Sequence, residues 1–228
     1  MRKIRTVSYG AIASALTLAC AQTAGAQQVP PIDACLAIDG YYEFRQKLEQ
    51  IVKRRDTKAL IALADPQIDT DFFGGRGSVA SFKRNFNLDA GKKSYIWDEM
   101  ETMLRLGCDG RENAISFPYM ETYSADIGEI DGYSKGARDG STGYGVLIGN
   151  NIRLHAAPDE KAPVIATSNW DRYRFHAYSD NRDWAQISIA GDKKGWVKST
   201  YLRDFSNYRM GFERKNGVWV MIYILAGT

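Results

Sequence analysis

Apolar residues recur every three or four positions in the first half of the chain and every second position in the second half. Tyr41, Phe44, Leu48, Ile51 and Val52 form one apolar stripe, which predicts an amphipathic helix. A capping residue followed by a similar short stripe predicts three further helices, which begin at Asp56, Ser78 and Ser94. Residues 68–73 and 114–123 alternate between apolar and polar side chains and predict strands, whereas 128–145 is a connector rich in glycine and charge.

The C-terminal residues predict a β-hairpin. Residues 207–214 alternate, Asn216-Gly217 is a strong hairpin-turn signal, and 218–225 is apolar on both faces. A strand of that kind is expected to be buried between two layers. We therefore expect the hairpin to return to the N-terminal helices and complete an antiparallel sheet beneath them. The predicted fold of this part is α+β, with a layout that resembles the cystatin/NTF2 group.

Short alternating runs separated by turn residues occupy 150–202 and predict a small closed β-barrel. The first run contains Asn151-Ile152-Arg153 and ends at Ala157-Pro158, and the last is Gly195-Trp196-Val197, followed by Tyr201-Leu202. These paired ends resemble the bacterial SH3 domain (SH3b, SH3 type 3), over about a quarter of the chain. The resemblance implies an SH3-like barrel that binds cell-envelope material or a protein partner, and it does not imply catalysis.

The expected organisation follows from these patterns. Residues 1–26 read as a secretory signal peptide, 27–142 as an α+β domain completed by 205–228, and 143–204 as an inserted barrel. The signal has a basic start, a short apolar run and the cleavage site Ala24-Gly25-Ala26. Lipidation at Cys20 is the less favoured alternative, because the aliphatic residue of a lipobox is missing. We expect a periplasmic protein without a transmembrane segment.

Charge does not indicate a nucleic-acid partner. Loss of the signal removes three of the 30 basic residues and none of the 27 acidic ones, so the mature chain is formally neutral. Residues 27–142 carry a formal charge of −4 and 143–228 one of +4. The two parts are expected to dock on each other, although a basic face for an anionic wall polymer is the alternative.

The candidate binding residues come from the alternation within the barrel and from the resemblance. Ile152, Leu154, Ala185, Ile187 and Val197 are predicted to point inward, as are Tyr173, Phe175 and Ala177. The outward set is then rich in aromatic residues and arginine, which dominate binding hot spots. The candidates are Arg153, Tyr178, Trp184, Trp196 and Tyr201, with His155 and His176 also outside. The alternative is that Trp184 and Trp196 pack against loops or the neighbouring domain.

Cys35 and Cys108 are an even pair in an exported chain and predict a disulfide. A catalytic cysteine is disfavoured because both histidines lie in the barrel and Cys108 follows a helix end. Asp65, Asp69 and Asp71 are weak candidates for an acid pair or a metal site, and we expect no catalytic residue, no metal site and no cofactor.

The sequence thus favours a non-enzymatic envelope protein whose partner is a cell-wall polymer, a peptide or an envelope protein. Two other classes stay open. One is an enzyme or small-molecule binder with a cavity between the helices and the sheet. The other is a hydrolase inhibitor or scaffold in which the barrel is purely structural.

Overall fold

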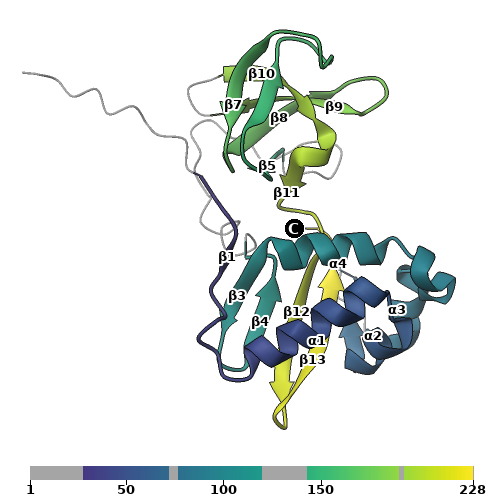
Figure 1. The fold of residues 1–228 in the computed structure, drawn as a ribbon. Coiled ribbons are helices and arrows are strands. Elements are labelled where there is room, and N and C mark those ends of the chain that lie inside the picture. The colour runs from purple at the N-terminus through teal and green to yellow at the C-terminus, as the bar shows by residue number, and fades with distance from the viewer. Residues whose placement is uncertain (1–27, 72–76, 120–142, 190–192, 228) are drawn as a thin grey trace, which may run out of the picture.

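The structure is a computed structural model that describes residues 28–71, 77–119, 143–189 and 193–227. The predicted signal peptide lies outside these residues, as do the end of the strand predicted at 114–123 and most of the predicted connector. Four α-helices and two β-sheets in the described part define a mixed α+β protein. The helices pack beside the first sheet, and the second sheet lies beyond α4 at the other end of the molecule (Figure 1).

The first sheet has six strands in the order β1-β3-β4-β12-β13-β2. Its three central pairings are antiparallel, and the two outer pairings, β1 with β3 and β13 with β2, are parallel. The strands are β1 (Ile32–Asp33), β2 (Ala64–Asp69), β3 (Gly107–Arg111), β4 (Ala114–Phe117), β12 (Arg209–Lys215) and β13 (Val218–Leu225). The strand predicted at 68–73 therefore begins earlier, directly after the second helix, and its predicted end at Phe72 and Phe73 lies outside the described residues.

The helices lie on one face of this sheet (Figure 1). They are α1 (Tyr41–Arg54), α2 (Thr57–Leu63), the 3-10 helix η1 (Leu88–Lys93), α3 (Val79–Asn85) and α4 (Ile96–Arg105). The apolar stripe predicted for α1 is buried throughout. Asp56 accepts a hydrogen bond from the Ala59 amide, and Ser78 forms a reciprocal capping pair with Ser81, so both of these predicted caps are confirmed.

Ser94 caps the start of α4 as predicted, although the helix is assigned from Ile96, one residue later than expected. Its hydroxyl accepts a hydrogen bond from the Ile96 amide at 3.4 Å, and Tyr95 between them already has helical backbone angles. The same hydroxyl donates to the buried Phe86 carbonyl oxygen, which ties the start of α4 to the end of α3. This second bond matters because an unpaired buried acceptor is costly.

The C-terminal hairpin returns to the N-terminal part of the chain, as predicted, and it stands in the middle of the first sheet. Strand β12 pairs with β4, and β13 pairs with β2, so residues more than 90 positions apart lie side by side. Phe212, Trp219 and Met221 enter the core beneath the helices. The Phe44 ring of α1 meets the Phe212 ring edge-on at 4.9 Å between centroids and lies 5.6 Å from that of Trp219.

The expected burial of β13 between two layers is wrong for the described part of the chain. Trp219, Met221 and Ile224 are buried beneath the helices. On the opposite face Val218 is 61 % exposed, and Val220 and Ile222 are only partly buried. The two-sided apolar pattern therefore marks a central strand, whose neighbours on both sides shield it, rather than a strand with a layer on each face.

The second sheet has seven strands in the order β11-β5-β8-β9-β10-β6-β7, and every pairing is antiparallel. Its strands are β5 (Tyr144–Leu147), β6 (Ile152–His155), β7 (Val164–Ser168), β8 (Arg172–Tyr178), β9 (Trp184–Ile189), β10 (Lys193–Lys198) and β11 (Leu202–Asp204). Leu154, Ile187 and Val197 point into its apolar interior, as the alternation predicted. The hydrogen-bonded ladder ends at β11 and at β7 among the described strands, so the predicted closed barrel does not appear as a closed ladder.

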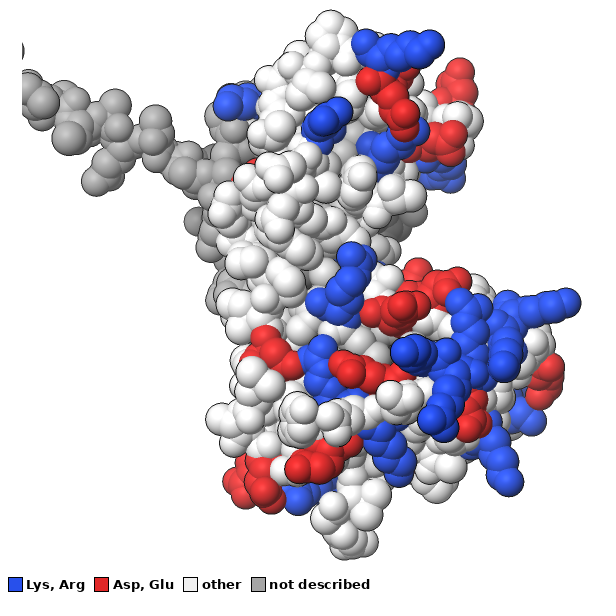
Figure 2. Space-filling model, in the orientation of Figure 1, with Lys and Arg blue, Asp and Glu red and all other residues white. Residues whose placement is uncertain are grey.

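Apolar and charged contacts join the two sheets. Val29, Leu106, Val146 and Ile148 form a small buried cluster at the junction. The buried Arg203 of β11 reaches across it, with its guanidinium 3.3 Å from the Glu99 carboxylate of α4 and a second hydrogen bond to the Tyr208 carbonyl oxygen. Figure 2 shows a largely uncharged surface on the second-sheet body just above the junction, whereas both signs of charge mix over the helices, where ion pairs such as Arg55–Asp98 form.

The predicted disulfide between Cys35 and Cys108 is present and buried, with the two Cα atoms 5.7 Å apart. It fastens the short edge strand β1 to β3. We expect replacement of both cysteines by serine to lower the free energy of unfolding by roughly 2–5 kcal/mol, because the bond closes a loop of 73 residues in the unfolded chain. Urea denaturation of the mature chain measures this loss, and two alkylatable thiols in non-reduced protein would contradict the prediction.

The hairpin generates a second prediction. Met221 is fully buried, so Met221→Ala should cost roughly 2–5 kcal/mol of unfolding free energy, whereas Val218→Ala near the exposed turn should change it by less than about 0.5 kcal/mol. A chain that ends at Asp204 should lose the cooperative unfolding of its helices, followed by their circular-dichroism signal, although its second sheet can still unfold cooperatively. A cooperative loss of the helical signal in that shortened chain would show that the first sheet does not depend on the hairpin.

Candidate functional site

The register of β9 and β10 puts the two candidate tryptophans on the same, outer face of the second sheet. Trp184 stands opposite Lys198, and Trp196 stands opposite Gln186. On its other side Trp196 pairs with His155 of β6. Directly opposed residues share a face, so these five side chains form one outer surface, which we call the Trp196 face.

Trp184 is not exposed on this face, so its prediction as a contact residue is wrong. It is only 6 % exposed. The Lys198 ammonium nitrogen lies 4.5 Å from the centre of its ring, and the His155 ring meets it edge-on at 5.3 Å. Lys198 is held there by an ion pair with Glu160 at 3.0 Å. Lys198 thus covers the Trp184 ring, which agrees with the alternative that Trp184 packs against neighbouring residues.

His155 points outward as predicted but is buried, because the turn after β6 folds back over it. Its Nδ1 atom is 2.9 Å from the Ala162 carbonyl oxygen, and its ring fills the space beside Trp184. Trp196, by contrast, is only partly buried. It is the aromatic side chain of the face that a ligand can reach.

A bulge in β8 separates Tyr178 from the tryptophans. The register shifts between Phe175 and Ala177, so that Ala177 stands opposite Gln186 and Tyr178 opposite the inward-facing Ala185. The predicted grouping of Tyr178 with the tryptophans is therefore wrong. Tyr178 is 37 % exposed, its ring centre is 4.6 Å from that of Phe175, and the Arg182 guanidinium lies 4.7 Å above it.

The other two candidates, Arg153 and Tyr201, lie on other elements than β10, the strand that carries Trp196. Arg153 is exposed on β6, two residues before His155 and on the same face, opposite Thr167 of β7. Tyr201 is 39 % exposed in the short 3-10 helix η2 (Ser199–Tyr201), after the end of β10. Its carbonyl oxygen accepts a hydrogen bond from the Ile148 amide, which belongs to the junction between the sheets.

The structure adds a basic row to the Trp196 face that the sequence analysis did not single out. Ser188 of β9 stands opposite Arg174 of β8 on one side and Lys194 of β10 on the other. His176 lies 3.1 Å from the Ser188 hydroxyl through Nε2. Burial lowers the pKa of His176, and the positive charges of Lys194 and Arg174 lower it further. Alternation places Lys194 on the outer face with Trp196, but the bulge that exposes His176 has no clear sequence signal.

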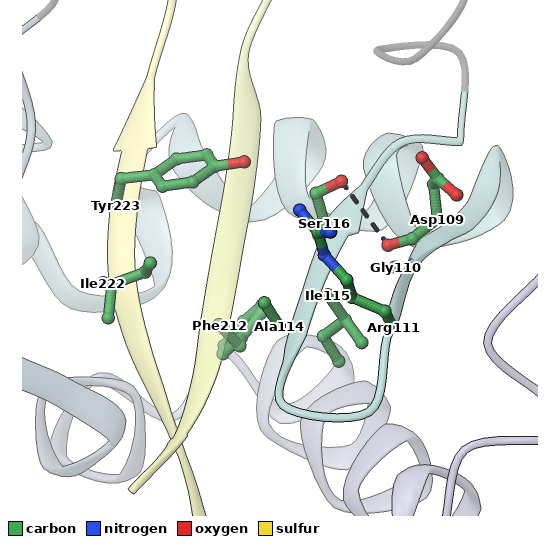
Figure 3. Close-up of a pocket in the computed structure, with 9 residues that line it drawn as sticks. All are labelled: Asp109, Gly110, Arg111, Ala114, Ile115, Ser116, Phe212, Ile222 and Tyr223. Carbon is green, nitrogen blue, oxygen red and sulfur yellow. Dashed lines mark hydrogen bonds between the residues drawn. The ribbon is translucent and has the colours of Figure 1, made fainter.

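Open cavities lie at two places beside the described strands of the first sheet. One, of about 420 Å³, lies on the face away from the helices, where Arg111 and Ser116 come from one hairpin and Ile222 and Tyr223 from β13 (Figure 3). The other, of about 440 Å³, is lined by Ile32, Leu36 and Tyr42 near the disulfide. The space between the helices and the sheet, where a ligand cavity was the alternative expectation, is filled by the apolar core.

A polar cluster next to the disulfide is a structural network. The Tyr41 hydroxyl donates to the Asp33 carboxylate at 2.7 Å, and Arg45 pairs with the same carboxylate. Burial, followed by the hydrogen bond to Asp33, raises the pKa of Tyr41 well above its usual value, so this hydroxyl stays protonated. The Asp33 carboxylate also lies near the sulfur atoms of Cys35 and Cys108, but sulfurs joined in a disulfide are not thiolate ligands.

The three aspartates considered as an acid pair or metal site do not converge. Lys215 binds Asp65 at 2.6 Å, and this hydrogen bond lowers the pKa of the Asp65 carboxyl. Asp69 accepts a hydrogen bond from the Asp71 amide, a local turn contact. Each carboxylate whose contacts are described here serves the fold.

The chain matches no family model, no curated protein and no solved structure. Within the part of the chain that the structure describes, every helix is too short or too polar to span a bilayer.

The different burial of the two tryptophans is testable. Trp184→Ala should lower the free energy of unfolding by roughly 3–5 kcal/mol, the usual cost of a lost core aromatic residue. Trp196→Ala should cost clearly less, because its ring is only partly buried. Urea melts of both variants measure the difference, and equal losses would remove Trp196 from consideration as a surface contact.

Proposed function

We propose that the protein is an exported envelope protein that binds a cell-wall polymer on the Trp196 face of its second sheet. The observation that carries this proposal is the composition of that face. A half-buried tryptophan lies between Gln186 and His155 on a rigid three-strand surface, and its ring is not used to fill the apolar interior. A flat aromatic surface beside hydrogen-bonding groups is suited to a sugar or an extended peptide.

The resemblance to bacterial SH3 domains supports the same proposal. The structural reason for Gly195 in the Gly-Trp-Val run is steric, since a Cβ atom there would come within 2.9 Å of the Ile165 Cδ1 atom and 3.1 Å of the Leu154 Cβ atom. The start of β6 likewise follows Asn151, which adopts a positive φ of 56° that asparagine tolerates well. We propose an SH3-like second domain at 143–204, inserted in an α+β domain of cystatin/NTF2 type.

The proposed location is the periplasm. The predicted signal peptide and the buried disulfide both support export into an oxidising compartment. Residues 143–204, which contain the whole second sheet, carry nine basic and seven acidic residues, and this small formal charge of +2 supports an anionic wall polymer over a cationic ligand.

A small-molecule or enzymatic role is the second candidate, and the cavity of Figure 3 is the observation that favours it. The polar side chains that line this cavity are Asp109, Arg111, Ser116 and Tyr223, of which Ser116 is engaged with the Asp109 carbonyl oxygen at 3.5 Å. A nucleophile needs an adjacent base, and the two histidines of the chain lie on the second sheet. We therefore favour the binding role.

Co-sedimentation with purified peptidoglycan tests the proposal. The mature chain should pellet with the polymer in a saturable way, and Trp196→Ala should weaken binding by roughly 1–3 kcal/mol, the range of a hot-spot residue. Tyr178→Ala is the matched control, because it removes an exposed aromatic ring from the other face of the same sheet and should bind like the wild type.

Two results would contradict the proposal. Equal loss of binding in both variants would show that the Trp196 face is not the binding surface. If the wild type does not bind peptidoglycan but captures a protein from envelope extract, and Trp196→Ala abolishes that capture, the ligand is a protein and not the polymer.

A further inference from the structure

We infer that the ligand unit in contact with Trp196 is an uncharged sugar that carries an acetamido group, and that Gln186 recognises this group. The inference rests on the proposed function and specifies which part of the wall polymer is bound, namely its glycan and not its peptides. Three observations carry it: the row of residues in which Trp196 stands, the amide of Gln186, and the position of both residues inside the sheet.

Trp196 stands in a row of directly opposed residues that runs across the strands. From β6 to β8 this transverse row contains the buried His155, then Trp196, Gln186 and the exposed Ala177. Directly opposed side chains share a face, and neighbouring strands lie about 4.8 Å apart, so the row is a strip about 14 Å long. A flat, elongated ligand fits such a strip with its long axis across the strands.

The transverse row contains no lysine, arginine, aspartate or glutamate. Arg153 and Lys194 belong to the rows on either side, two residues along their strands. Lys198 is already paired with Glu160 at 3.0 Å. An ionic group placed on the Trp196 ring would lose hydration without a directly opposed partner, so the unit in contact with the ring is uncharged. The basic rows can attract acidic groups elsewhere on the polymer.

Gln186 offers an amide that the fold does not use. Its side chain is half-buried on β9 and has no hydrogen-bond partner among the residues that the structure describes. The bulge in β8 leaves it uncovered, because the register shift places the methyl group of Ala177, and not the ring of His176, opposite Gln186. A side-chain amide both donates and accepts, and an acetamido group matches it with one N–H and one carbonyl oxygen.

The position of Trp196 and Gln186 inside the sheet favours a sugar over a peptide strand. In the order β8-β9-β10-β6, the two strands that carry these residues have a neighbour on each side. An extended peptide gains affinity from main-chain hydrogen bonds to a sheet edge, which β9 and β10 do not offer. A sugar ring needs the face instead, since its apolar side stacks on an aromatic ring while its substituents bind neighbouring polar groups.

Soluble tetrasaccharides test the acetamido group directly. The tetramer of N-acetylglucosamine should shift the indole N–H signal of Trp196 saturably in NMR spectra, with the signal assigned by its loss in Trp196→Phe. Cellotetraose has a hydroxyl in place of each acetamido group and should bind about tenfold more weakly, the effect of a lost hydrogen-bonded group. Equal affinities of the wild type for the two tetramers would overturn the inference.

A substitution of Gln186 tests the residue. Gln186→Ala should weaken binding of the acetylated tetramer about tenfold and leave cellotetraose binding unchanged, because only the hydrogen bonds to the acetamido group are lost. Gln50→Ala is the matched control, since Gln50 is exposed on α1, beside the other sheet. A urea melt checks that both variants are folded. Full binding of the acetylated tetramer by folded Gln186→Ala would overturn the role of Gln186.

Competition experiments separate this inference from the proposed function. Glycan strands freed of their peptides should displace the protein from peptidoglycan, whereas the released peptides should not. Displacement by the peptides alone would leave the proposed function standing and overturn the inference. Gln186-dependent binding of the acetylated tetramer, without binding to peptidoglycan, would support the sugar site and reject peptidoglycan as the polymer.

Discussion

The position of the C-terminal hairpin in the middle of the first sheet is the constraint on which the rest of the structure depends. Without β12 and β13, strand β4 would have no partner on one side and β2 would have none in this sheet. The helices would also lose the apolar sheet surface against which they pack, because Phe212, Trp219 and Met221 fill the core beneath them. The chain must therefore leave the sheet after β4, build the second sheet and come back.

That return fixes the second sheet at both of its ends. Strand β11, the last before the hairpin, pairs with β5, the first after the gap in the described chain. Arg203 of β11 is buried with Glu99 and the Tyr208 carbonyl oxygen, and a buried charge of this kind is stable only while its partners stay in place. The N-terminal residues add a third attachment, since the Val29 amide donates to the Trp170 carbonyl oxygen before the chain enters β1. These three attachments fix the position of the second sheet, which carries the Trp196 face.

Much of this fold could be read from the sequence, because its signals are local. The stripe of α1, the caps at Asp56 and Ser78 and the Asn216-Gly217 turn each involve residues within a few positions of one another. The disulfide was predictable from the two cysteines that remain after the predicted signal peptide, with Cys20, is set aside. The second partner of Ser94, the Phe86 carbonyl oxygen at the end of another helix, is not encoded in local spacing.

The candidate site was predictable only in part, for two physical reasons. Alternation gives the face on which a side chain lies but not what covers it, so Trp184 was placed on the correct face and its burial beneath Lys198 was missed. Alternation also assumes an unbroken strand. The bulge before Ala177 carries Tyr178 to the opposite face and brings His176 to Ser188, so one extra residue exchanged a predicted contact for an unforeseen one.

The late arrival of the hairpin also determines when the protein can fold. Domains usually fold in the order in which they are synthesised, N-terminal part first. Here the first sheet stays incomplete until Leu225 has been made, whereas the second sheet needs nothing after Asp204. The second sheet therefore has all its strands before the first sheet does, although its residues are made after the N-terminal helices. The apolar faces of the N-terminal helices therefore stay uncovered until β12 and β13 have been made.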